Sequence, residues 1–65
     1  MKVLKSKIIQ AAIIQMEDWE ERYPESRYTV LWKGKDEENQ YSARSLQDAE
    51  EYYEYRCRVV EQRRV

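Results

Sequence analysis

The first third of the chain carries hydrophobic residues at helical spacing. At about 100° per residue, six of the apolar side chains from Leu4 to Tyr23 fall on one face. We therefore predict a helix from Leu4 to Arg22. It would end before Pro24, because the residue that precedes a proline is displaced from helical geometry. The predicted core face consists of Leu4, Ile8, Ala12, Met16, Trp19 and Tyr23.

From residue 27 the hydrophobic pattern changes to alternation. Aromatic and β-branched residues take every second position across 27–33, which predicts a strand. The charged stretch 34–39 includes the only glycine and predicts a loop, after which 40–44 can return as a second strand. One face of this hairpin would carry the apolar residues of both strands: Tyr28, Val30, Trp32, Tyr41 and Ala43.

The last segment is helical again in its pattern. Ser45 suits the N-cap position, and Asp48 three residues later completes a capping-box-like arrangement, so we expect a helix from Leu46. Its predicted core face consists of Leu46, Ala49, Tyr53, Cys57 and Val60. The valines near the end of the chain leave an alternative in which 57–65 forms a third strand.

These elements predict one small α+β domain over 1–65, in the order α-β-β-α, with a two-stranded antiparallel hairpin packed on two helices. A domain of this length buries only about 60% of its unfolded surface and is marginally stable alone. Association with a second chain is one way to bury more of that surface. The length therefore favours a protein that works with a partner.

The composition argues against several kinds of chemistry. The chain has no histidine and a single cysteine, Cys57, so it offers no Cys/His zinc set, no Ser-His or Cys-His pair and no internal disulfide. We expect no catalytic, cofactor-binding or metal-binding residue. The single thiol favours a reducing compartment, and we expect a cytoplasmic protein. No segment approaches the roughly 18 consecutive apolar residues of a membrane span, so no membrane partner is expected.

The charges occur in blocks, although they nearly cancel to a net charge of −1. If the first and last helices were antiparallel, their basic ends would meet at one pole and could bind nucleic-acid phosphates. A sequence pI near 5.5 argues against that use, so nucleic-acid binding is kept as the alternative function. The predicted basic pole consists of Lys2, Lys5, Lys7, Arg56, Arg58, Arg63 and Arg64.

The last helix has more apolar and aromatic surface than one core face needs. Tyr52, Tyr55 and Val59 form a stripe beside the predicted core face, and tyrosine is favoured at protein interfaces. The alternative is that these residues only flank the core of their own chain. We expect a small non-enzymatic interaction or regulatory protein that forms a homodimer through this stripe. The sequence does not identify any other protein partner.

Overall fold

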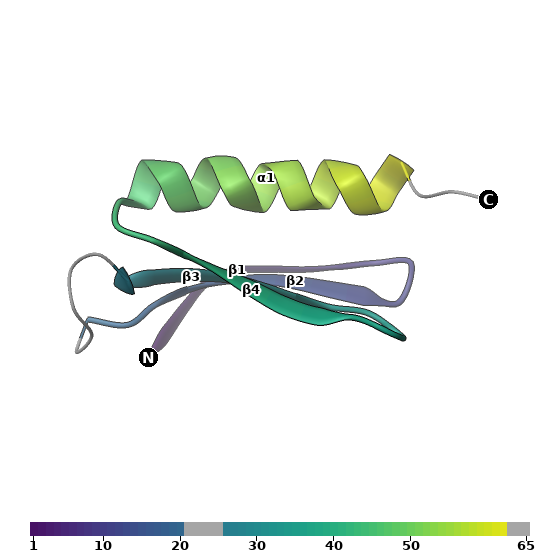
Figure 1. The fold of residues 1–65 in the computed structure, drawn as a ribbon, viewed down its shortest axis with the longest axis horizontal. Coiled ribbons are helices and arrows are strands. Elements are labelled where there is room, and N and C mark those ends of the chain that lie inside the picture. The colour runs from purple at the N-terminus through teal and green to yellow at the C-terminus, as the bar shows by residue number, and fades with distance from the viewer. Residues whose placement is uncertain (21–25, 63–65) are drawn as a thin grey trace.

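The computed structural model describes residues 1–20 and 26–62. The strands form one antiparallel sheet in the order β1-β2-β3-β4, and the helix runs along one face of it (Figure 1). The fold is therefore α+β, with the helix after the sheet. The elements are β1 (Lys2–Ile9), β2 (Ala12–Asp18), β3 (Tyr28–Lys33), β4 (Glu38–Ala43) and α1 (Leu46–Gln62).

The predicted first helix is wrong, because β1 and β2 form a hairpin over that part of the chain. The arrangement α-β-β-α with a two-stranded hairpin is therefore wrong as well. Six apolar residues of that segment can be placed on one helical face, but the segment also contains four isoleucines, whose β-branched side chains favour strands. Packing of β2 against β3 and α1 favours strands over a helix in this segment. The predicted end of that helix, at 21–24, lies outside the described residues.

The turn between β1 and β2 explains why the hairpin was not predicted. Gln10 and Ala11 have φ angles of 50° and 69°, so both lie in the left-handed region. Two-residue hairpin turns with this geometry usually contain Asn-Gly or a similar pair, because other residues are strained there. Gln-Ala carries no such signal, and the chain offers no other mark of a turn at this point.

The C-terminal half follows its prediction more closely. The predicted strand at 27–33 is β3, and the return strand runs over 38–43 instead of 40–44. The helix begins at Leu46, and the backbone N–H of Asp48 donates to Ser45 Oγ at 3.1 Å, as expected for an N-cap. The alternative third strand is wrong for residues 57–62, which are helical, and residues 63–65 lie outside the description.

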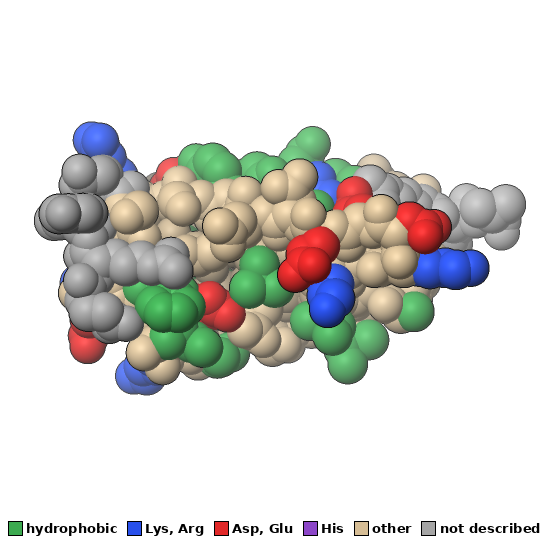
Figure 2. Space-filling model, turned by 60° about the horizontal axis from the view of Figure 1, so that its bottom comes forward, with side chains coloured by type: hydrophobic (Ala, Val, Ile, Leu, Met, Phe, Trp, Pro, Cys, Tyr) green, Lys and Arg blue, Asp and Glu red, His purple; other side chains and the backbone are tan. Residues whose placement is uncertain are grey.

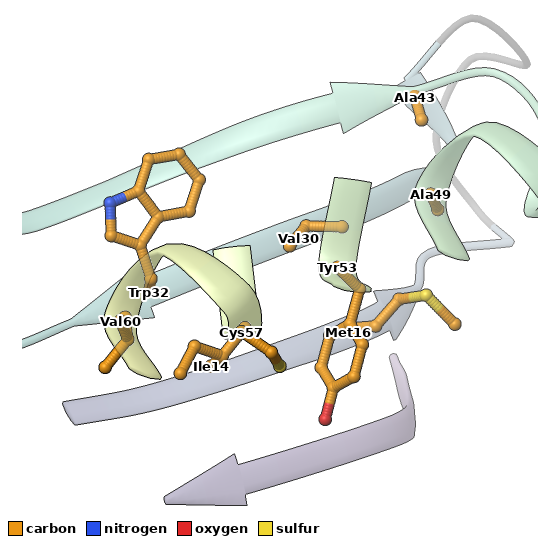
Figure 3. Packing of buried hydrophobic residues seen from close by; sticks show 9 residues of the cluster. All are labelled: Ile14, Met16, Val30, Trp32, Ala43, Ala49, Tyr53, Cys57 and Val60. Carbon is orange, nitrogen blue, oxygen red and sulfur yellow. The ribbon is translucent and has the colours of Figure 1, made fainter. Parts of the chain in front are cut away.

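The core lies between the sheet and α1, with side chains of β2 and β3 pointing toward the helix (Figure 3). Four of the five predicted helix positions are buried, and Leu46 is the exception with 44% of its surface exposed. Trp19, predicted in the core, is only half-buried, whereas Trp32 is buried. The buried hydrophobic residues are Ile14, Met16, Val30, Trp32, Ala43, Ala49, Tyr53, Cys57 and Val60.

The strand register separates the two faces of the sheet. Tyr28 lies opposite Ala43 and Val30 opposite Tyr41, so the predicted apolar face of the second hairpin is confirmed. Ile8 belongs to the opposite face and is 72% exposed. Figure 2, with the sheet side turned toward the viewer, shows hydrophobic side chains in separate groups among polar ones. No described element covers this face, and it does not form one continuous apolar patch.

Candidate interaction surface

One flank of α1 faces the edge strand β1 and is charged. Lys5 and Lys7 point to the helix side of the sheet, because they lie opposite buried residues of β2. The distance from Lys5 Nζ to Glu50 Oε2 is 3.6 Å, and from Lys7 Nζ to Glu61 Oε2 it is 3.9 Å. All four side chains stay about half exposed to water. We call these residues the charged flank.

The other flank of α1 faces β4 and is aromatic. The ring of Tyr52 stacks on Tyr41 with 4.2 Å between centroids, and it is tilted against Trp32 and Tyr55 with 5.6 Å to each. The rings therefore form a row from β3 and β4 onto the helix. Such contacts add to the free energy of burial because the rings interact through their quadrupoles. We call Trp32, Tyr41, Tyr52 and Tyr55 the aromatic flank.

Polar groups hold the aromatic flank in place. The hydroxyl of Tyr41 donates to Asp48 Oδ2 at 2.9 Å, and this hydrogen bond, together with burial, raises the pKa of Tyr41. The Arg56 guanidinium lies over the Trp32 ring, with Cζ 4.1 Å from its centroid. The row of rings is therefore fixed by a carboxylate on one side and a cation on the other.

The predicted partner stripe lies on this aromatic flank, but its residues are not equally exposed for contact with a partner. Tyr52 is half-buried among three rings of its own chain, and Val59 is half-buried too. Tyr55 is 48% exposed at the outer end of the row. Sequence reasoning did not include Tyr41 or Arg56 in this surface. One sequence feature could have placed Tyr41 there: it shares a predicted hairpin face with Trp32.

The β4 edge below the aromatic flank is open for hydrogen bonding. The backbone N–H of Gln40 donates to Asn39 Oδ1 at 3.0 Å, which indicates that it faces the open edge and not β3. Alternate residues of a strand direct their backbone groups to the same side. The N–H and C=O groups of Glu38, Gln40 and Ser42 therefore face the edge. No partner strand of the described chain lies there.

The predicted basic pole loses its geometric basis with the first helix. Lys2 and Lys7 lie toward opposite ends of β1. Lys7 and Lys5 face glutamates of the helix, whereas Arg56 lies over a ring on the opposite flank. Arg58 is exposed on the helix, and Arg63 and Arg64 lie outside the described residues.

The single thiol belongs to the core and not to the surface. Cys57 is buried beside Ile14 and Tyr53 (Figure 3), and burial raises the pKa of its thiol. A protonated, buried thiol is a poor nucleophile. In the described ranges, no group of three or more potential metal ligands comes together, and α1 lacks the length and hydropathy to cross a membrane.

No protein family, curated protein or solved structure matches this chain. A function must therefore be inferred from the contacts of the chain itself. Within the described residues, the aromatic flank above an open strand edge is the surface best suited to bind another molecule. It combines the exposed ring of Tyr55 with a strand edge that pairs with no other described strand.

Proposed function

We propose that this chain is a protein-protein interaction module that acts by contact and not by catalysis. Its binding surface is the aromatic flank together with Val59. The observation that carries this proposal is the ring of Tyr55, which is 48% exposed and lies against Tyr52 at the end of a row of ring contacts. A tyrosine held by its neighbours can bury a large area on binding while losing little further conformational freedom.

We propose that the partner is a second copy of the chain, in the cytoplasm. A chain of 65 residues without a disulfide has little core to stabilise it alone, and its free, buried thiol suits a reducing compartment. A symmetric dimer needs only one self-complementary surface. If the two helices lie antiparallel, Asp48 on the aromatic flank of one copy lies on the side of the half-helix that carries Arg56 in the other.

Sedimentation equilibrium over about 5 to 500 μM tests this proposal, since that range brackets a micromolar dissociation constant. We expect the mass to rise toward twice the 8.0 kDa of the chain. Tyr55→Glu combined with Val59→Glu should keep the protein monomeric, because each half of the interface would gain two carboxylates. Tyr52 is left intact because its ring packs inside its own chain.

A matched control keeps the size and apolar character of the surface. Tyr55→Phe combined with Val59→Ile should remain dimeric at the same concentrations. A wild-type protein that stays monomeric up to the highest concentration would contradict the homodimer. A steeply salt-dependent affinity for nucleic acid, lost in Arg63→Glu with Arg64→Glu, would instead favour the nucleic-acid alternative.

A further inference from the structure

We infer that two copies of the chain join through β4, so that their sheets form one continuous sheet with four strands from each copy. In this arrangement Tyr41 of one copy lies opposite Tyr41 of the other, and both helices lie on the same face. The inference rests on the proposed function, because it specifies how the proposed homodimer forms.

The two edges of the sheet differ in the features that prevent strand pairing. β1 carries Lys2, Lys5 and Lys7, and its pairing with β2 shifts between Val3 and Lys5. Lysines and irregular pairing are the usual protection of an edge against a second chain. β4 contains neither lysine nor proline, and its pairing with β3 runs without a shift from Glu38 to Ala43. The open edge therefore lies on the side of the aromatic flank.

The charges at the two ends of β4 fix the register of the pairing. Glu38 begins the strand and Arg44 follows its last residue. When the strand pairs antiparallel with itself about Tyr41, Glu38 of each copy lies opposite Arg44 of the other. The same register places Gln40 opposite Ser42, and both direct their backbone groups to the edge. Each such pair exchanges two hydrogen bonds, with the partner C=O replacing Asn39 Oδ1 on the Gln40 N–H.

The size of the tyrosines fits the space between the two helices. α1 lies mainly over β2 and β3, so in the joined sheet the helix axes are four strand spacings apart, or about 19 Å. An average helix with its side chains is about 10 to 12 Å wide, which leaves about 7 to 9 Å between them. Small side chains would not fill that space. The ring of Tyr41, which rises from β4 on the helix side of the sheet, lies in that space in both copies.

Cysteine cross-linking tests the register directly. A Gln40→Cys chain is mixed with an isotope-labelled Ser42→Cys chain, under mild oxidation, and the disulfides are counted by mass spectrometry. Opposite residues in a hydrogen-bonded pair have Cα atoms about 5.5 Å apart, within the range for a disulfide. The Cα atoms at position 40 of the two copies would be about 8 to 9 Å apart, which is too far for a disulfide. We expect the mixed disulfide in excess of random pairing. Random proportions, or an excess of either unmixed product, would overturn the inference.

Ser42→Pro tests the pairing without touching the aromatic flank. Proline removes the N–H at the edge and is tolerated on an edge strand, so the monomer should fold with the wild-type circular dichroism spectrum. Ser42→Ala keeps the N–H and is the matched control. We expect Ser42→Pro to be monomeric where Ser42→Ala is dimeric.

The pattern of variants separates this inference from the proposed function. If Ser42→Pro stays dimeric while Tyr55→Glu with Val59→Glu is monomeric, strand pairing is overturned and the aromatic interface stands. If the reverse holds, strand pairing stands and the proposed surface is wrong. A wild-type chain that is monomeric up to about 500 μM overturns the homodimer, whether it is held by strand pairing or by the aromatic flank.

Discussion

The two flanks of α1 use opposite means to join the helix to the sheet. On the charged flank, half-exposed lysines of β1 meet glutamates at 3.6 Å and 3.9 Å. On the aromatic flank, rings stack from β3 to the helix surface with centroids 4.2 to 5.6 Å apart. Exposed ion pairs contribute little to stability, whereas ring contacts that bury apolar area, such as those of the buried Trp32, contribute more. The aromatic flank should therefore stabilise the domain more than the charged flank does.

This difference also assigns a role to each edge of the sheet. Lysines that project over β1 oppose the addition of another strand, because pairing there would desolvate their charges. The same lysines need a solvated position, which an edge provides. β4 lacks that protection and lies beside the exposed ring of Tyr55. In the proposed homodimer, pairing through this edge alone would give a closed dimer and not an open chain of copies.

The largest expected effect on stability comes from removing the indole ring of Trp32 from the aromatic flank. Trp32→Ala should lower the free energy of unfolding by about 3 to 5 kcal/mol, because the indole is buried and packs on Tyr52 and Arg56. That loss approaches the whole stability of a small domain. Urea denaturation followed by circular dichroism measures it. Trp19→Ala is the control and should cost less, because Trp19 is half-buried; an equal loss would contradict this packing.

The C-terminal half of the fold was predictable because its signals are local and agree with one another. Alternation across β3, the Ser45 cap and the spacing of Ala49 and Tyr53 agree with one another, and only the end of the last segment, 57–65, left an alternative. The N-terminal hairpin was not predictable, because its apolar residues can form a helical face and its turn has no Asn or Gly. The pairing of β2 with β3 decides its structure, and that contact is distant in sequence.

The candidate site was predictable only in part, for a related reason. Helical spacing places Tyr52, Tyr55 and Val59 on one stripe whatever the rest of the chain does. The partners of that stripe, Tyr41 and Trp32, depend on the order of strands in the sheet. The geometric argument for the basic pole assumed a helix over the residues that form β1 and β2.

The next effect concerns the hairpin that carries the charged flank. Gln10→Asn combined with Ala11→Gly should raise the free energy of unfolding by about 1 to 2 kcal/mol, because both residues have positive φ angles. Thermal unfolding in dilute solution measures the gain. Ala12→Gly is the matched control, since it lies within β2, and it should destabilise by about 0.5 to 1 kcal/mol. Stabilisation by both variants would contradict the turn geometry.

A smaller effect is expected from the hydrogen bond that holds the aromatic flank. Tyr41→Phe keeps the ring that stacks on Tyr52 but removes the donor to Asp48, so it should cost about 0.5 to 1.5 kcal/mol. Chemical denaturation of the two proteins gives the difference. Tyr55→Phe should cost less, because its ring is about half exposed. If the two losses were reversed in order, the Tyr41 hydroxyl would have no structural role.

The smallest change in stability should come from the lysines of the charged flank. Lys5→Ala and Lys7→Ala should each cost about 1 kcal/mol or less, and added salt should reduce the difference from the wild type. Their larger effect should be on association, because the double variant removes two of the three lysines that protect the β1 edge. Light scattering should show species beyond the dimer for this variant. A double variant that never exceeds the wild-type mass would contradict a protective role for these lysines.

The most direct test of the difference between the two edges is amide hydrogen exchange measured at two protein concentrations, about 5 and 500 μM, which bracket a micromolar dissociation constant. Strand pairing protects the amides that face a new partner strand. We predict that the amides of Gln40 and Ser42 exchange more slowly at the higher concentration, while those of β1 exchange at the same rate at both. Exchange at β4 that does not depend on concentration, or slower exchange confined to β1, would contradict the account.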